Sequence, residues 1–228
     1  MTPEERKLTA ALAAADLIED GMRLGLGTGS TMEHLLAAIA DRGLDVAGVP
    51  TSEATTAYCR QLGIALLDPG EPDRLDLAID GADQLDEALT ATKGGGGALL
   101  REKVVASMAD RFVIIATTDK LVPRLADTFP LPVEVVPFAL GPVTRRLTQR
   151  GYEVELRRAG GGPAAVTDNG NNLLDVRLDG GIEDPAIEEA WITLLPGVVA
   201  CGLFVELADL ALLADDAGHI TELRPPTD

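Results

Sequence analysis

Along the first half of the chain, hydrophobic residues come either in short continuous runs or at spacings of three and four. Short apolar runs predict buried strands, and the wider spacing predicts amphipathic helices. The predicted helices cover residues 1–18, 31–40, 53–62 and 98–108, and the predicted strands cover residues 22–27, 46–50, 64–67, 75–79 and 112–116. Strands that alternate with helices of about ten residues indicate βαβ units and a mostly parallel sheet. In such sheets, ligands bind beyond the carboxyl ends of the strands.

The second half of the chain has a different pattern, with more proline and glycine turns. The proline-rich segment 129–137 is interpreted as a crossing between domains. Helices are predicted over 143–150 and 185–195, and strands over 152–156, 198–205 and 210–213. The turn 168–172 joins 165–167 to 173–178 in a hairpin-like arrangement. This pattern indicates a second, smaller α+β domain, inserted before the chain returns to the first sheet.

Composition narrows the class of protein. The formal net charge of −18 on 228 residues argues against nucleic acid and against an anionic membrane surface, because both need a basic footprint. The longest apolar runs are too short to span a bilayer, and the charged first residues lack the apolar core of a signal peptide. Two cysteines, Cys59 and Cys201, suit a reducing compartment. A cytoplasmic protein is predicted.

The glycine turn Gly25-Leu-Gly-Thr-Gly-Ser-Thr31 follows a predicted strand and precedes a predicted helix. In that position, free amides and the helix dipole favour an anion such as phosphate. The turn lacks the lysine of a Walker A loop, and Ser30 replaces the last glycine of the dinucleotide pattern. Hydroxyls at 28, 30 and 31 therefore favour a small phosphorylated ligand. A plain turn in which Ser30 or Thr31 caps the helix remains an alternative.

The segment with the most chemistry runs from Asp80-Gly-Ala-Asp83 through Lys93 and four glycines to Arg101-Glu102-Lys103. Carboxylates move protons, a lysine stabilises a developing oxyanion, and glycine lets backbone amides approach a ligand. An Asp-Gly turn with Asp83 as a helix cap would explain the carboxylates alone. It does not explain a lysine and a tetraglycine so close behind them.

Glu102 shares a helical stripe with Ala98, Val105 and Ala109, beside the predicted core stripe of residues 100, 104 and 108. A carboxylate among apolar neighbours has a raised pKa, as a general base requires. The alternative is a rim glutamate paired with Arg101 or Lys103. His34 and His219 lie far from any ligand-like cluster, so no metal site is predicted.

Taken together, these motifs resemble the ribose-5-phosphate isomerase A family from about residue 4 to the end of the chain. The matching segments are 25–31, 80–83, 93–96, 100–103, 118–120, 129–135, 166–171, 196–199 and 202–204. Gln84 departs from the family pattern where an acid is frequent, and Gly97 departs where alanine is common. Neither position carries a predicted chemical role, although Gln84 changes the local charge.

The resemblance implies an α/β fold with a Rossmann-like domain, residues 1–128 plus 205–228, and a smaller α+β domain, residues 129–204. It implies interconversion of ribose 5-phosphate and ribulose 5-phosphate through an enediolate, without a metal or a cofactor, in a homo-oligomer, either a dimer or a tetramer. Glu102 would be the base, Lys93 and the glycine amides would stabilise the oxyanion, and Asp80 and Asp83 would handle hydroxyl protons and ring opening. The implied substrate-binding residues are Lys7, Thr28, Gly29, Ser30, Thr31, Asp80, Gly81, Ala82, Asp83, Lys93, Gly94, Gly95, Gly96 and Lys120.

Two rival functions remain open at this point. A sugar-phosphate sensor would keep the binding pocket without the chemistry. A nucleotide-binding oxidoreductase would need an intact dinucleotide pattern, which this chain lacks.

Overall fold

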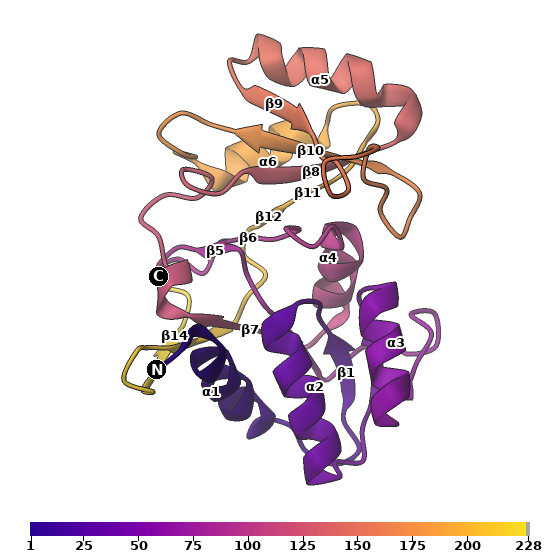
Figure 1. The fold of residues 1–228 in the computed structure, drawn as a ribbon, viewed down its shortest axis with the longest axis vertical. Coiled ribbons are helices and arrows are strands. Elements are labelled where there is room, and N and C mark those ends of the chain that lie inside the picture. The colour runs from indigo at the N-terminus through magenta and orange to yellow at the C-terminus, as the bar shows by residue number, and fades with distance from the viewer. Residues whose placement is uncertain (227–228) are drawn as a thin grey trace.

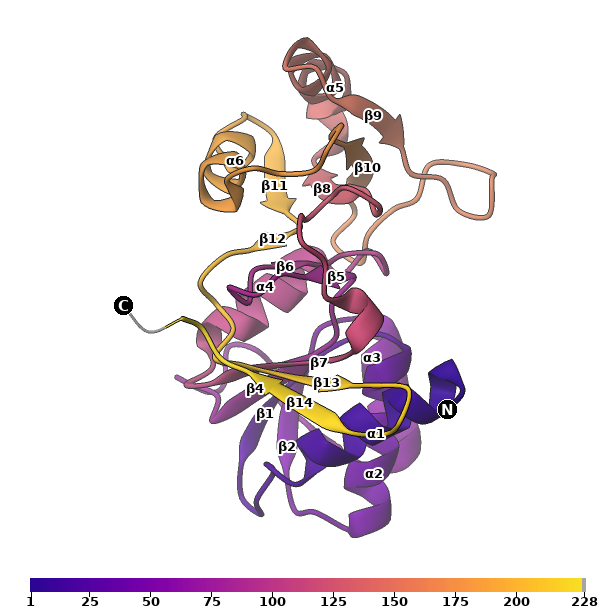
Figure 2. The ribbon, with the colours of Figure 1, turned by 90° about the vertical axis from the view of Figure 1, so that its left-hand side faces the viewer.

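The computed structural model describes residues 1–226. Its centre is a seven-stranded sheet in the order β14-β13-β7-β4-β1-β2-β3 (Figure 1). The sheet is mostly parallel, as predicted, and β14, which was not predicted, is antiparallel to β13. Figure 2 shows β13 and β14 side by side at the edge of this sheet. Its strands are β1 Arg23–Leu26, β2 Ala47–Pro50, β3 Ala65–Leu66, β4 Leu77–Asp80, β7 Phe112–Thr117, β13 Leu210–Ala214 and β14 Ile220–Leu223.

Helices cover both faces of the sheet, so its central strands β7 and β13 are buried along their whole length. Along β7, Val113 and Ile115 point to a core shared with α1 (Pro3–Ala15), α2 (Ser30–Arg42) and α3 (Glu53–Leu62). Ile114 and Ala116 point the other way, toward α4 (Leu99–Met108). This alternation is the two-residue period of a β-strand. Because helices cover both faces, the carboxyl ends of the strands are the edge of the sheet where polar groups collect.

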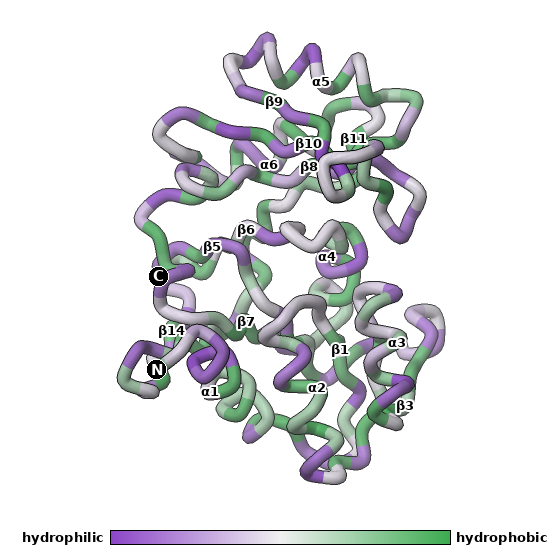
Figure 3. Tube along the Cα trace, viewed as in Figure 1, coloured by the Kyte–Doolittle hydropathy of each residue, from purple (hydrophilic) through white to green (hydrophobic). Residues whose placement is uncertain are grey.

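A four-stranded antiparallel sheet, in the order β11-β8-β10-β9, forms a second layer above the first (Figure 1). With the two helices that pack on it we call it the four-stranded unit. Figure 3 shows hydrophobic and polar residues alternating along α5, whose Val143 and Leu147 are buried. The elements are β8 Leu131–Val135, α5 Leu140–Gln149, β9 Glu153–Leu156, β10 Asn172–Arg177, α6 Pro185–Thr193 and β11 Val198–Cys201. The smaller α+β unit is therefore present, and the division at residues 129 and 204 stays a prediction.

A third sheet of three very short strands lies between these two layers, in the order β12-β6-β5. The strands are β5 Gln84–Leu85, β6 Ala91–Thr92 and β12 Leu203–Phe204. Two-residue strands have too little pattern to be predicted, and neither β5 nor β6 was expected. The strand predicted over 198–205 is in fact two strands in different sheets. The break falls at Gly202, where an added Cβ would lie 2.4 Å from the carbonyl oxygen of Lys93.

Three other predictions need correction. The proline-rich segment 129–137 contains β8, a central strand, and Pro132 contributes its carbonyl to a hydrogen bond from Gly202 N. The hairpin-like turn makes only an isolated bridge, between Val166 and Asn172, because the partners of β10 are β8 and β9. The predicted core stripe of α4 is wrong, since Val104 is 45% exposed. The buried residues of this helix are Leu99, Glu102, Val105 and Ala106.

Within residues 1–226, no helix has both the length and the apolar character needed to cross a membrane. Cys59 and Cys201 are free and buried.

Candidate active site

Three loops meet at one edge of the seven-stranded sheet because the strands before them are neighbours. The strands β7, β4 and β1 are adjacent and parallel, so their carboxyl ends point the same way. The glycine turn follows β1, Gly81–Asp83 follows β4, and a short 3₁₀ helix, Thr118–Lys120, follows β7. Carboxyl ends of adjacent strands are where ligands bind in open α/β sheets.

The predicted site residues lie around one cavity of about 240 Å³ at this edge. Every one of them except Asp80 lines it, and three of the four lysines of the chain are among them. The sequence analysis missed Ile115, Ala116 and Thr117, which form one wall. They belong to a hydrophobic strand, and nothing in their pattern separates the cavity wall from the core. The lining residues are Lys7, Thr28, Gly29, Ser30, Thr31, Gly81, Ala82, Asp83, Lys93, Gly94, Gly95, Gly96, Glu102, Ile115, Ala116, Thr117 and Lys120.

A buried charge cluster of Asp80, Lys93 and Glu102 lies at the cavity, and of the three only Lys93 and Glu102 line it. The Lys93 ammonium lies 2.9 Å from an Asp80 carboxylate oxygen and 3.5 Å from a Glu102 carboxylate oxygen, and all three side chains are at most 5% exposed. Lys93 also donates a 2.6 Å hydrogen bond to the Gly81 carbonyl. One Glu102 oxygen, Oε2, has no hydrogen-bond partner within the described residues. This is the oxygen that lies 3.5 Å from Lys93, so the ammonium balances its charge without a hydrogen bond.

The protonation equilibria of this cluster suit proton transfer. The pKa of Glu102 is raised to about 8, with burial as the main cause; Lys93 opposes this shift, and the negative charges of Asp80 and Asp83 add to it. Burial likewise raises the pKa of Asp80, against the pull of Lys93. Burial alone would lower the pKa of Lys93, but Asp80 and Glu102 outweigh it, so the pKa is raised and the ammonium stays charged. A general base works best when its pKa lies near the working pH.

Asp80 lies under the glycine turn rather than on the cavity surface. One of its oxygens accepts hydrogen bonds from the Thr28 amide at 3.0 Å and the Gly81 amide at 2.7 Å. This contact needs a glycine at position 27, where an added Cβ would lie 2.2 Å from the Asp80 carboxyl carbon. The sequence analysis placed Asp80 among the substrate contacts. The structure shows its carboxylate occupied by two amides and Lys93.

The amino terminus of α2 opens onto the other end of the cavity. Its N-cap is Gly29, at φ +120°, and no side chain caps the helix. The capping alternative for Ser30 and Thr31 is therefore wrong, because both residues lie in the first turn. Free amides at a helix amino terminus attract an anion. Lys7, which pairs with Glu4 at 2.6 Å, also lines the cavity.

Thr28 has a different setting from its two hydroxyl neighbours. Its hydroxyl lies 2.8 Å from Thr51, 2.9 Å from Ser52 and 3.0 Å from Thr55. These contacts join the glycine turn to the start of α3. Thr28 thus lines the cavity while its hydroxyl is already satisfied by protein groups.

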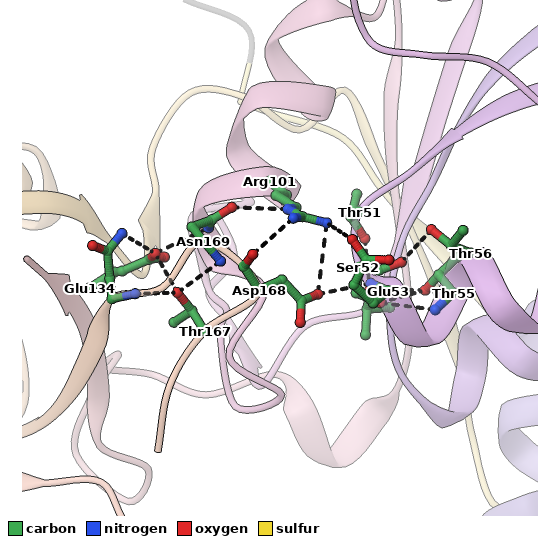
Figure 4. A network of polar contacts seen from close by, with 12 residues as sticks. Thr51, Ser52, Glu53, Thr55, Thr56, Arg101, Glu134, Thr167, Asp168 and Asn169 are labelled. Atoms are coloured by element: carbon green, nitrogen blue, oxygen red, sulfur yellow. Dashed lines mark hydrogen bonds and ion pairs between the residues drawn. The ribbon is translucent and has the colours of Figure 1, made fainter. Parts of the chain in front are cut away.

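Arg101, next to Glu102 on α4, ties the four-stranded unit to the seven-stranded sheet. Its guanidinium donates to Asn169, to the Asp168 carbonyl and to Glu53 at 3.0–3.1 Å. Figure 4 shows this network running from Glu134 to the start of α3. Lys103 pairs with Glu189 instead. The alternative in which Glu102 is a rim residue paired with Arg101 or Lys103 is therefore wrong.

Within residues 1–226, no three His, Cys, Asp or Glu side chains lie close enough to hold a metal ion. His34 contacts Glu4 and His219 contacts Asp215, both at the surface.

Comparison with known proteins gives a consistent result. The family described as Ribose 5-phosphate isomerase A (phosphoriboisomerase A) matches residues 47–218. A ribose-5-phosphate isomerase A of Rhodopseudomonas palustris is 46% identical over 228 residues, covering 96% of this chain and 97% of its own. The ribose 5-phosphate isomerase A structure of Methanocaldococcus jannaschii is 37% identical, with a TM-score of 0.92, covering 98% of this chain and 100% of its own. A D-ribose-5-phosphate isomerase solved in complex with phospho-erythronic acid is 34% identical, with a TM-score of 0.93 and the same coverage.

Proposed function

This chain belongs to the ribose-5-phosphate isomerase A family, and we propose that its cavity interconverts D-ribose 5-phosphate and D-ribulose 5-phosphate. The protein is an aldose–ketose isomerase. Its reaction belongs to the pentose phosphate pathway. The observation that carries the proposal is a buried carboxylate oxygen of Glu102 that makes no hydrogen bond within the described residues and lies 3.5 Å from the Lys93 ammonium, in the lining of a small cavity.

Glu102 is the base. Its carboxylate removes the proton from carbon 2 of the open-chain aldose, which leaves an enediolate, and returns a proton to carbon 1. A second proton moves from the oxygen on carbon 2 to the oxygen on carbon 1. The aldose and the ketose have the same composition and the same overall oxidation state, so the reaction requires no external oxidant or reductant.

Lys93 stabilises the negative oxygen of the enediolate. Its charge is fixed by Asp80, which holds the ammonium at 2.9 Å and does not itself reach the cavity surface. Gly94, Gly95 and Gly96, which we call the glycine-rich turn, line the same cavity, and their backbone amides are hydrogen-bond donors close to it. A positive group placed where negative charge develops lowers the barrier more than it strengthens substrate binding.

Asp83 is the carboxylate in position for the hydroxyl protons and for ring opening. It lines the cavity, and one of its oxygens accepts a 2.7 Å hydrogen bond from the Gly95 amide. The sequence analysis gave this work to Asp80 and Asp83 together. Because the Asp80 oxygens are occupied, we assign it to Asp83 and leave Asp80 as the partner of Lys93.

The phosphate binds at the opposite end, against the first turn of α2. Ser30 and Thr31 supply hydroxyls and amides there, and Lys7 and Lys120 supply positive charge. On a protein with a net charge of −18, a dianionic substrate needs such local positive charge. A volume of about 240 Å³ suits one sugar phosphate and leaves no room for a dinucleotide, since pockets for drug-sized ligands hold ~300–1,000 Å³.

The proposal is tested by mixing the purified protein with ribose 5-phosphate and a chelator and following the ketose. Appearance of ribulose 5-phosphate at an enzymatic rate is expected. Binding of ribose 5-phosphate without conversion would instead identify a sensor, which no observation on this site favours.

We also propose that the protein works in the cytoplasm as a homo-oligomer, a dimer or a tetramer. Two free cysteines suit a reducing compartment. Phe138 and Leu194 are large apolar side chains that are 97% and 81% exposed, as residues at a subunit contact would be in a single chain. Light scattering at several concentrations measures the mass, and a monomer at all of them would contradict the oligomer.

A further inference from the structure

One arginine of the four-stranded unit reaches the glycine-rich turn of the cavity from behind. Arg157 follows β9, and its Nη1 donates to the Gly94 carbonyl at 2.8 Å and to the Gly95 carbonyl at 3.1 Å. Arg157 does not line the cavity that the turn encloses. Its contact with the site is therefore through the backbone of the turn.

Arg157 is itself held rigidly. Its Nε lies 2.9 Å from an Asp175 oxygen, and its Nη2 donates to the other oxygen of the same carboxylate. The two side chains are only 17% and 21% exposed. A bidentate arginine–carboxylate pair fixes both the position and the plane of the guanidinium. The Nη1 group of the guanidinium, which the carboxylate does not use, therefore faces the Gly94 and Gly95 carbonyls.

The geometry of a trans peptide decides what this contact does. In a trans peptide the carbonyl and the following amide point in opposite directions, and residues 1–226 contain no cis bond. Binding of the Gly94 and Gly95 carbonyls from behind therefore turns the Gly95 and Gly96 amides forward. The Gly95 amide donates to Asp83 at 2.7 Å, and Gly96 lines the cavity. Glycine peptides have no side chain to fix their planes, and the only other hydrogen bond given for the Gly94 carbonyl among the described residues comes from the Gly97 amide at 2.9 Å.

We propose that Arg157 is a positioning residue that fixes the glycine-rich turn, so that the Gly95 amide holds Asp83 and the Gly96 amide faces the enediolate. The positive guanidinium, which donates to both carbonyls, also polarises the two peptide groups and makes their amide hydrogens better donors. This inference rests on the proposed function, because it concerns an oxyanion formed in that reaction. It adds to that function a catalytic contribution from the four-stranded unit, which supplies no side chain to the cavity lining.

The test compares Arg157→Ala and Arg157→Lys with a matched control, Arg158→Ala. Arg158 donates to Gly162 within its own loop and reaches no part of the turn. We expect both Arg157 variants to lose about ten- to a thousandfold in kcat, the scale for disturbing an oxyanion donor, with KM changed little. Lysine keeps the charge but lacks the fork that reaches two carbonyls and Asp175 together, so it should not restore kcat. The control should match wild type.

Two ligands separate positioning from a general loss of structure. Phospho-erythronic acid carries a carboxylate at the reacting end, and inorganic phosphate probes the α2 end alone. In the Arg157 variants the first should bind about tenfold or more weakly, and the second should bind as in wild type. Unchanged kcat in a folded variant, or an equal loss of affinity for both ligands, would overturn the proposal. If Arg157→Ala does not fold, Asp175→Asn, which releases the guanidinium, decides by the same two measurements. If the wild-type protein does not convert ribose 5-phosphate, the proposed function itself is contradicted.

Discussion

The Glu102 carboxylate lies 3.5 Å from the Lys93 ammonium, and the two side chains are 5% and 3% exposed. The pair is close enough for charge attraction and yet leaves Glu102 Oε2 without a hydrogen bond among the described residues. Closer contact would lower the pKa of the glutamate and weaken it as a base. The observed spacing keeps Glu102 basic and Lys93 charged, which is the combination that an enediolate mechanism needs.

The dependence of kcat/KM on pH reports the base of the free enzyme. Burial raises the pKa of Glu102 to about 8, so the carboxylate is mostly protonated and inactive at pH 6. We expect kcat/KM to rise about tenfold per pH unit below that pKa and to level off above it. Lys93 lowers the pKa of Glu102, so the rise in a Lys93→Met variant should move to higher pH. A rise centred near pH 4.5 in wild type would contradict this assignment.

Glu102→Gln should be more stable than wild type, and the difference in stability should grow as the pH rises. The folded-state pKa of about 8 lies above the ordinary value of 4.5, so the folded state holds its proton more tightly. Below pH 4.5 the group is protonated in both states, and the stability that proton binding contributes is fully present. It is lost as pH rises toward 8. The melting temperature of Glu102→Gln should therefore exceed that of wild type by an amount that grows from pH 4.5 to 8, and a constant difference would count against it.

Lys120→Ala should raise KM by about ten- to a hundredfold with kcat nearly unchanged. A charge-assisted contact to phosphate is made equally in the ground state and the transition state, and hydrogen bonds to charged groups contribute ~1.5–3 kcal/mol. Arg124→Ala is the control, because Arg124 is a cation outside the cavity that donates to Gly180. An unchanged KM in Lys120→Ala would remove Lys120 from the phosphate site.

Gly27→Ala should abolish most activity by displacing Asp80. The added methyl would lie 2.2 Å from the Asp80 carboxyl carbon, so the carboxylate that holds Lys93 must move. A displacement at a catalytic group of about 1 Å costs roughly a hundredfold in rate. Gly141→Ala is the matched control, since its nearest neighbour is a flexible arginine tip at 3.6 Å. Wild-type kcat in Gly27→Ala would show that Asp80 does not set the position of Lys93.

The sequence predicted the central sheet well because its strands and helices differ strongly in hydrophobic period. Helix α3, for example, occupies the predicted residues 53–62 between the cap at Ser52 and the left-handed Gly63. Prediction failed where pairing with neighbouring strands outweighs the conformational preference of the local sequence. The prolines around β8 indicate a linker, but two neighbouring strands hold the segment extended. The strands β5, β6 and β12 are too short to carry any period.

The candidate site was predictable as a set of residues and much less as an arrangement. Residues from segments 7, 28–31, 81–83, 93–96, 102 and 120 lie around one cavity, although more than a hundred positions separate the first from the last. The sequence did not indicate that Asp80 is beneath the turn, because burial of a carboxylate depends on its tertiary neighbours. The Arg157 contact joins residues 62 and 63 positions apart, which no local pattern encodes.

The kcat of the Glu102→Gln variant tests whether Glu102 is the base. Glutamine has the same shape and does not accept a proton, so we expect kcat to fall about a hundredfold to ten-thousandfold, or ~3–5 kcal/mol of barrier. The fold should be retained, as checked by the melting curve. Near-normal turnover in a folded variant would remove Glu102 from the mechanism.

The most direct measurement of the central claim is the exchange of hydrogen at carbon 2 during turnover in D₂O, followed by NMR. If Glu102 carries the proton through an enediolate, wild type should introduce solvent deuterium at carbon 2 of ribose 5-phosphate as the sugars equilibrate, and Glu102→Gln should not on the same time scale. Deuterium entry at carbon 2 at the wild-type rate in folded Glu102→Gln would contradict the account.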